Sequence, residues 1–141
     1  MKTKELDKDS FFVILLGIIF DTKKKKILIG KRTSDPYIHE LTWAFPGGRA
    51  EKTDQELDET LKFKIKEETG LNVENLGVVF AKTYQENKNF LSIYYLCEVV
   101  SGKEKPFGDL KELKWVSPEE LEKFFSSSFH PVLKEYILNL K

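Results

Sequence analysis

One helix in the middle of the chain carries the clearest start and stop signals in the sequence, and it constrains the fold most. Thr53 followed three residues later by Glu56 forms a capping box, and Gly70 supplies a left-handed stop. Apolar residues recur every four positions between these signals and predict one buried stripe, formed by Leu57, Leu61 and Ile65. We therefore expect an amphipathic helix over about residues 54–69.

The segments around this helix have the composition of β-strands. β-branched and aromatic residues are separated by polar turns in two hairpins, one before the helix (11–20 and 27–32) and one after it (76–84 and 90–100). The first of these strands is apolar throughout and is predicted to be buried on both faces. A short apolar stretch at 43–45 precedes a predicted turn at Pro46-Gly47-Gly48, and a last strand is expected at 113–116.

Two more helices are predicted after the last strand. Ser117-Pro118-Glu119-Glu120 opens the first with a cap and a proline in the first turn, and residues 131–140 form the second. Strands in hairpins, with one helix between them and others at the end, imply a mixed sheet covered on both faces. The predicted fold class is α/β, as an α/β/α sandwich. The 141 residues fit one domain, predicted over 11–141, preceded by a flexible arm over 1–10.

The charge balance limits the partners of this chain. It has 23 basic and 23 acidic residues, so no net field attracts it to nucleic acid or to an anionic membrane. Its longest apolar run is roughly half of the ~20 residues that a membrane-spanning helix needs. The N-terminus lacks the pattern of a secretory signal, and Cys97 is interpreted as a buried strand thiol. We expect a cytoplasmic protein without nucleic-acid or membrane partners.

Two glycines precede the central helix, and two glutamates lie in its last turn. Water attacks a diphosphate only when divalent cations screen its charge and orient its oxygens. Mg²⁺ prefers hard oxygen ligands, which Glu67 and Glu68 could supply from a rigid helix. Gly47 and Gly48, at the helix entry, would let backbone approach the phosphates. These residues could hold a magnesium-bound diphosphate, whereas two glutamates on a lysine-rich helix without further context are more often a solvated face.

These features together resemble the Nudix family. Residues 48–71 read GRAEKTDQELDETLKFKIKEETGL. This segment resembles the Nudix box, which is glycine, five residues, glutamate, seven residues, then Arg-Glu-apolar-x-Glu-Glu-x-Gly-apolar. Further segments resemble family segments in the same order: Gly30-Lys31-Arg32, Trp43 to Gly48, and Glu112 to Leu121. The resemblance implies a Nudix-like α/β/α sandwich with a mixed β-sheet.

The box departs from the family pattern at several positions. Counting back from Gly70, the family arginine falls on Phe63, its neighbouring glutamate on Lys64, and the early glutamate on Gln55. A lysine is protonated at neutral pH and cannot coordinate a cation. Lys64 lies four residues before Glu68, within about 40° on a helical wheel. We expect Lys64 to pair with Glu68 and to stand in partly for a metal ion.

The resemblance implies a set of site residues. The predicted catalytic carboxylates are Glu67, Glu68, Asp109 and Glu112, and the predicted metal ligands are Glu67 and Glu68. Contacts to substrate are predicted for Arg32, Gly47, Gly48 and Arg49. The weaker candidates Glu51 and Glu56 lie near the helix entry. Aromatic residues that could stack on a base are Tyr37, Trp43 and Phe45, with packing the safer reading for Trp43 and Phe45.

The leading hypothesis is a magnesium-dependent hydrolase that cleaves the diphosphate bond of a nucleoside diphosphate derivative, either a nucleotide or a nucleotide-sugar. Mn²⁺ is an alternative to Mg²⁺ as the cofactor. The second hypothesis is a Nudix-fold module that binds a nucleotide or a protein without turnover, because Lys64 replaces a family catalytic glutamate. The sequence does not identify the nucleoside or the general base, and it leaves open whether the protein forms a homodimer.

Overall fold

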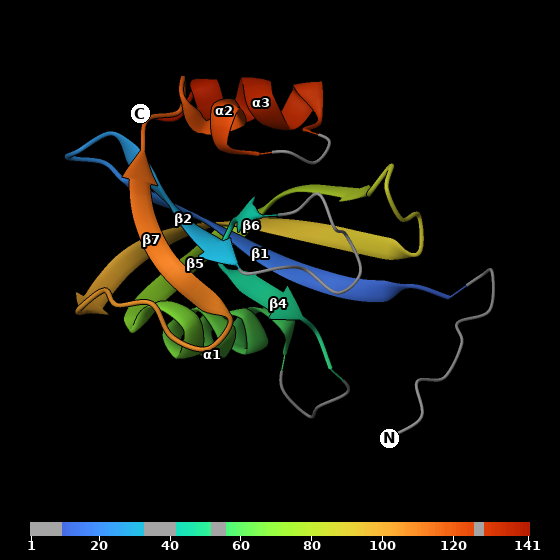
Figure 1. The fold of residues 1–141 in the computed structure, drawn as a ribbon, viewed down its shortest axis with the longest axis horizontal. Helices are drawn as coiled ribbons and strands as arrows, with labels where there is room; N and C mark the ends of the chain where they lie inside the picture. The colour runs from blue at the N-terminus through green and yellow to red at the C-terminus, as the bar shows by residue number, and fades with distance from the viewer. Residues whose placement is uncertain (1–9, 33–41, 52–55, 126–128) are drawn as a thin grey trace.

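The computed structural model describes residues 10–32, 42–51, 56–125 and 129–141. The elements follow one another along the chain as β1 (Phe12–Asp21), β2 (Lys26–Arg32), β3 (Trp43–Ala44), β4 (Gly47–Arg49), α1 (Leu57–Thr69), β5 (Leu71–Thr83), β6 (Phe90–Gly102), β7 (Leu110–Val116), α2 (Leu121–Phe124) and α3 (Pro131–Leu138). The sheet lies between α1 on one face and α2 with α3 on the other (Figure 1). The predicted α/β/α sandwich is confirmed.

The sheet is mixed, and β1 is its centre. Its strand order is β3-β2-β1-β6-β5, with β4 added to β1 and β7 added to β2. β1 and β6 run parallel, whereas the other pairs are antiparallel. β1 pairs with β2 only near its end, at Phe20 and Asp21, and with β4 over 14–16. The two neighbours therefore diverge along one side of β1, and Gly17 bridges the divergence by donating its N–H to the carbonyl oxygen of Pro46 at 2.8 Å.

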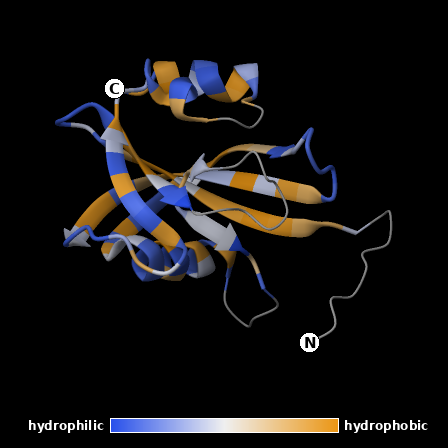
Figure 2. Cartoon of the chain, in the orientation of Figure 1, coloured by the Kyte–Doolittle hydropathy of each residue, from blue (hydrophilic) through white to orange (hydrophobic). Residues whose placement is uncertain are grey.

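Alternating side chains of β1 supply both halves of the core. Leu15 and Ile19 face α1 and pack in one cluster with Leu61 and Ile65. Leu16, Ile18 and Phe20 face the other way, into a cluster that is completed by residues of α2 and α3, Leu121, Leu133 and Ile137. The central strands are accordingly the most apolar part of the chain in Figure 2. The prediction that this strand is buried on both faces is confirmed.

The central helix begins later than predicted. α1 starts at Leu57, and its N-cap Glu56 makes no side-chain capping bond. Thr53, the other half of the predicted capping box, lies outside the described residues. Leu57 is 43% exposed, so of the predicted apolar stripe only Leu61 and Ile65 are buried, and the prediction for Leu57 is wrong. The predicted stop is confirmed, because Gly70 adopts φ 78° and its N–H donates to the carbonyl oxygen of Lys66.

Gly47 and Gly48 lie in a strand, so the predicted turn at Pro46-Gly47-Gly48 is wrong. β4 is three residues long and pairs with the middle of β1, Gly47 opposite Leu16 and Gly48 opposite Leu15. The backbone of Gly47 has φ +145°, a conformation that favours glycine. Close pairing with a buried strand overrides the local turn preference of a proline followed by two glycines.

Several smaller predictions concern packing. The buried Phe45 packs on Tyr94 and Phe125 and belongs to the core, and the partly buried Trp43 packs against the same cluster, edge to face on Phe124. The predicted start of the last helix at residue 131 is confirmed, since α3 begins at Pro131 and Nδ1 of His130 accepts the N–H of Val132. Tyr37 lies outside the described residues.

Cys97 is the buried strand thiol that the sequence predicts. It is 1% exposed, and its Sγ donates to Oδ1 of Asn75 at 3.2 Å. Burial raises the pKa of the Cys97 thiol to about 12, so the reactive thiolate is suppressed. Among the described helices, none combines the length and the apolar character that crossing a membrane requires.

Candidate functional site

Separate parts of the chain converge where the last turn of α1 meets the sheet. Arg32 is the final residue of β2, Gly47 is the first residue of β4, and Glu68 lies in the last turn of α1. β4 pairs with β1 over 14–16 and β2 pairs with it only at 20–21, so the two strands diverge from each other, and the end of α1 contacts both through Glu68. The fold thereby brings together three residues that the sequence analysis selected independently.

Glu68 is the centre of this arrangement. Its Oε1 accepts the backbone N–H of Gly47 at 2.9 Å, and its Oε2 lies 3.3 Å from Nη2 of Arg32. The side chains of Arg32 and Glu68 are only 19% and 11% exposed, so the pair is shielded from most of the solvent. A buried pair of this kind interacts more strongly than one at the surface.

The surroundings of Glu68 act on its pKa in opposing directions. Burial has the largest effect and raises the pKa of the carboxyl above its ordinary value of 4.5. The N–H of Gly47 and the guanidinium of Arg32 lower it, and the nearby charge of Asp109 raises it again. Desolvation thus outweighs the two donors, and the carboxylate is a group for which additional positive charge would be stabilising.

Lys64 lies beside the glycine strand. A Cβ placed on Gly48 would lie 3.6 Å from Cδ of Lys64, so the aliphatic part of the lysine passes along this residue. Its Nζ lies 4.0 Å from Oε1 of Glu51, whose side chain is 69% exposed. The predicted pairing of Lys64 with Glu68 is wrong, because Arg32 pairs with Glu68 and the ion pair of Lys64 is with Glu51.

Residues 105–107, which precede β7, form backbone hydrogen bonds with the end of α1. The N–H of Phe107 donates to the carbonyl oxygen of Glu68 at 3.0 Å, and the N–H of Lys105 donates to that of Thr69 at 2.9 Å. Asp109 follows on this segment, exposed and close enough for its charge to act on Glu68. Of the two carboxylates predicted near β7, Asp109 therefore lies within electrostatic reach of the helix end.

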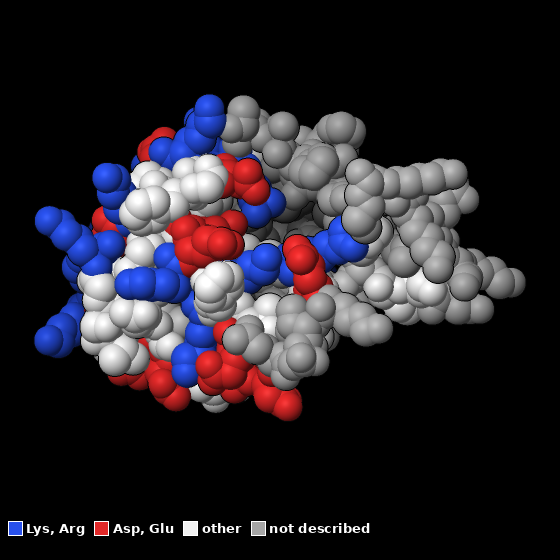
Figure 3. All heavy atoms as spheres, turned by 90° about the horizontal axis from the view of Figure 1, so that it is seen from below, with Lys and Arg blue, Asp and Glu red and all other residues white. Residues whose placement is uncertain are grey.

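The remaining predicted residues lie around this centre. Glu112 is exposed on β7 and opposite Lys31 of β2. Glu67 is exposed in the last turn of α1. The guanidinium of Arg49 stands 4.1 Å from the centre of the Phe12 ring, on the far side of β4 from Gly48. Figure 3 shows the face of the molecule that carries α1, where basic and acidic side chains are interspersed.

The sequence analysis selected the residues of this site but did not predict which of them form ion pairs with each other. The pair Arg32 and Glu68 joins residues 36 positions apart, and no local pattern signals such a contact. Glu51 was a weak candidate near the helix entry, and its role as the partner of Lys64 depends on where the chain leaves β4. Within the described residues, no group of three or more His, Cys, Asp or Glu side chains is arranged to hold a metal ion without other ligands.

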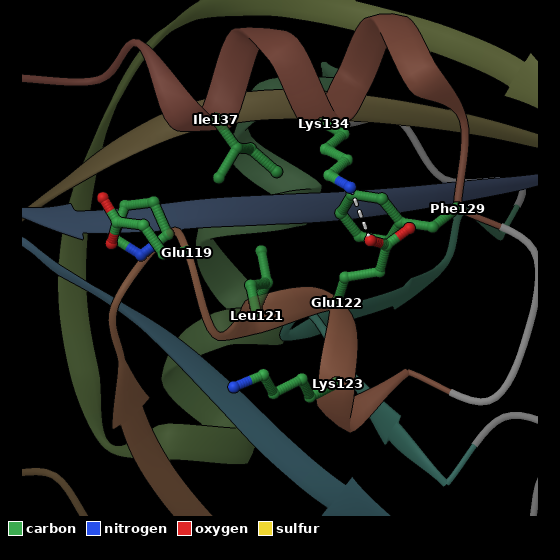
Figure 4. A pocket seen from close by; sticks show the side chains of 8 residues that line it. Glu119, Leu121, Glu122, Lys123, Phe129, Lys134 and Ile137 are labelled. Atoms are coloured by element: carbon green, nitrogen blue, oxygen red, sulfur yellow. Dashed lines mark hydrogen bonds and ion pairs between the residues drawn. The ribbon is translucent and has the colours of Figure 1, made fainter.

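A separate pocket of about 270 Å³ lies between α2 and α3, on the opposite face of the sheet from α1 (Figure 4). Leu121 and Ile137 form its apolar floor. Glu122 and Lys134 form an ion pair of 2.7 Å at its edge. None of the predicted site residues lines this pocket, so it is distinct from the site at the end of α1.

Comparison with known proteins gives a consistent picture. The family profile of the NUDIX domain matches residues 12–137. An ADP-ribose pyrophosphatase of Methanocaldococcus jannaschii is 32% identical over 124 residues, which cover 86% of this chain and 70% of that protein.

Solved structures share the fold. An ADP-ribose pyrophosphatase of Streptococcus suis superimposes with a TM-score of 0.63 at 24% identity, covering 77% of this chain and 75% of the other. A NUDIX hydrolase of Nitrosomonas europaea superimposes with a TM-score of 0.71 at 16% identity, covering 94% and 70%. The sequence match spans almost the whole described fold, including the glycine strand and the acidic end of α1, and the chain therefore belongs to the Nudix family of hydrolases.

Proposed function

We propose that this protein hydrolyses the diphosphate bond of a nucleoside diphosphate derivative with the help of Mg²⁺. The observation that carries the proposal is the contact between Gly47 and Glu68, which places a glycine strand beside the acidic last turn of α1. A relative that is 32% identical is named an ADP-ribose pyrophosphatase, which supports a nucleotide-sugar as the class of substrate to test first.

The donors at this end of α1 suit a divalent cation that arrives with its substrate. Glu67, Glu68 and Asp109 offer hard carboxylate oxygens. The described residues contain no self-sufficient metal cluster. Mg²⁺ in phosphate-transfer sites commonly takes one or two carboxylates and completes its coordination with water and substrate phosphates. We therefore assign Glu67 and Glu68 as its ligands, with Mn²⁺ as a substitute.

Other residues would hold the diphosphate. Gly48 has no side chain to block approach to its strand, and Lys64 lies along it with a positive charge. The guanidinium of Arg32 lies at the same site, beside Glu68. A guanidinium can bind a phosphate through two hydrogen bonds. Arg49 lies over the Phe12 ring and would reach a substrate group on that side of β4.

The reaction needs a positioned water and a group that accepts its proton. The metal ion, when bound, screens the phosphate charge and lowers the pKa of its water. Asp109 is the better placed proton acceptor of the two carboxylates near β7, because its charge already acts on Glu68. Glu112 lies further along β7, opposite Lys31, and we assign it a supporting electrostatic role.

The test is hydrolysis of a panel that contains ADP-ribose, other nucleotide-sugars and nucleoside di- and triphosphates. We expect Mg²⁺-dependent release of a nucleoside monophosphate from at least one of them. Glu68→Gln is expected to lower the rate by about 100-fold or more, which is the usual scale for losing a key electrostatic group. Lys62→Gln, at a half-buried position of the same helix where the lysine pairs with Glu59, should retain the wild-type rate.

One result of this test would refute the hydrolase proposal. If the wild-type protein hydrolyses none of these compounds faster than Glu68→Gln, yet still binds one of them, the hydrolase proposal fails. The second hypothesis, a binding module without turnover, would then describe the protein, with Lys64 as the neutralising charge beside Gly48.

A further inference from the structure

Both oxygens of the Glu68 carboxylate already have donors. Oε1 accepts the N–H of Gly47 at 2.9 Å, and Oε2 lies 3.3 Å from the guanidinium of Arg32. Because both side chains are largely buried, solvent screens this ion pair only weakly. A divalent cation that approaches Glu68 must therefore compete with a positive charge that is held in place by the fold.

A second, weaker pair has the same form. Nζ of Lys64 lies 4.0 Å from Oε1 of the exposed Glu51. Exposed ion pairs contribute little free energy, so this pair should yield readily to a ligand. The pair of Arg32 and Glu68 is the one that would control access to the carboxylate at the helix end.

A diphosphate can bind the guanidinium of Arg32 more strongly than Oε2 of Glu68 does. Guanidinium groups bind phosphate through two parallel hydrogen bonds, whereas Nη2 of Arg32 contacts Oε2 of Glu68 at 3.3 Å. Moving Arg32 toward a phosphate would leave a largely buried carboxylate without its cation, which is costly unless another cation replaces it. Moving Arg32 away from Glu68 would therefore make the binding of a metal ion at Glu68 more favourable.

We propose that Arg32 is a built-in counter-ion of Glu68 which a diphosphate draws away, so that divalent cation and diphosphate bind this site as a pair. The inference rests on the proposed function in taking a diphosphate as the ligand. Because coupling between two ligands is reciprocal, each should tighten the binding of the other by the same factor.

The first test measures Mn²⁺ binding by electron paramagnetic resonance in the absence of nucleotide. Arg32→Gln removes the competing charge and should tighten Mn²⁺ binding about tenfold, within the usual range of coupling between sites. Lys31→Gln is the matched control, since it removes one positive charge from the adjacent residue, whose Nζ lies 5.8 Å from the centre of the Trp43 ring. The double variant Arg32→Gln with Glu68→Gln should lose the gain. An Arg32→Gln protein that binds Mn²⁺ no more tightly than Lys31→Gln contradicts the proposal.

The second test uses Glu68→Gln alone, which preserves size and an acceptor for the Gly47 N–H and so protects folding. Without ligand, Glu68→Gln should bind Mn²⁺ within about twofold of wild type, because Arg32 already occupies the carboxylate. With methylenediphosphonate, wild type should bind Mn²⁺ about tenfold more tightly, corrected for chelation in protein-free samples, and the variant should not. A tenfold loss in Glu68→Gln without ligand would show that Glu68 binds metal at rest and would overturn the inference.

The methylene bridge of the probe resists hydrolysis, so coupling is measured whether or not the protein turns over a nucleotide. Coupling without hydrolysis of any compound in the panel would refute the proposed function and leave the role of Arg32 intact. Hydrolysis without coupling would refute the role of Arg32 and leave the proposed function intact.

Discussion

The backbone N–H of Gly47 donates to Oε1 of Glu68 across 2.9 Å, although these residues are 21 positions apart in the chain. The bond joins the first residue of β4 to the last turn of α1. It fixes the separation between the glycine strand and the acidic turn, and the proposed diphosphate site depends on that separation.

Removing the Glu68 carboxylate should destabilise the fold. In Glu68→Ala, the buried N–H of Gly47 loses its acceptor, which costs about 1–3 kcal/mol of the free energy of unfolding. Urea denaturation would measure this change. Glu68→Gln keeps an acceptor and should lose less, while the exposed Glu67→Ala should stay within about 0.5 kcal/mol of wild type. Equal losses in Glu68→Ala and Glu67→Ala would contradict the structural role of this bond.

Stability should depend on pH through Glu68. Burial raises the pKa of this carboxyl in the folded state above its ordinary value of 4.5. Its contribution to stability is therefore fully present below about pH 4.5 and is lost as the pH rises through the raised value. Glu68→Gln lacks this titration, so its stability relative to wild type should improve as the pH rises from about 4 to about 8. Thermal unfolding in metal-free buffers measures the difference, and a change of opposite sign would refute the shift.

The two glycines of β4 should differ sharply in their tolerance of alanine. A Cβ on Gly47 would overlap the carbonyl oxygen of Leu15, and its φ of +145° strains any other residue. Gly47→Ala should cost more than about 2 kcal/mol. Among the described residues, a Cβ on Gly48 meets Cδ of Lys64 at 3.6 Å, an ordinary contact, so Gly48→Ala should cost less than about 1 kcal/mol.

The same two variants separate folding from ligand binding. If the Gly48 strand meets the diphosphate, Gly48→Ala should remain folded by circular dichroism and yet raise KM by about tenfold, equivalent to about 1.4 kcal/mol of binding free energy. An unchanged KM would place the phosphates elsewhere.

Replacing Lys64 by glutamate restores the residue that the Nudix box carries at this position. A carboxylate beside Gly48, in place of an ammonium group, should increase Mn²⁺ affinity by about tenfold or more. Lys62→Glu is the matched control on the same helix, since Lys62 contacts Glu59 and Glu74 away from the glycine strand. Equal Mn²⁺ affinities of the two variants would show that Lys64 does not limit the site.

The fold was largely predictable because its elements carry local signals. The apolar run before Asp21 and the glycine at position 70 are signals that residues close in sequence carry by themselves. The structure has a strand and a helix end at these positions. The glycine strand was not predictable in this way. Pro46-Gly47-Gly48 has the composition of a turn, and only the pairing with Leu15 and Leu16 makes it a strand.

The candidate site shows the same division. The sequence singled out Arg32, Gly47 and Glu68 one at a time, whereas their contact depends on how β2 and β4 diverge from each other along β1. Lys64 is a neighbour of Glu68 on a helical wheel, but the wheel omits what lies opposite the helix. Arg32 reaches Glu68 from another strand, and Lys64 meets Glu51 instead.

The backbone hydrogen bonds of Lys105 and Phe107 to the end of α1 have a consequence for how this protein can vary. They are made by main-chain groups, so most substitutions between residues 104 and 109 would leave them in place. An added or deleted residue between Phe107 and Leu110 would shift Asp109 relative to Glu68 by roughly 3.5 Å, the span of one extended residue. Chain length is therefore more tightly restricted than side-chain identity in this segment, and indel scanning would reveal a sharp boundary there.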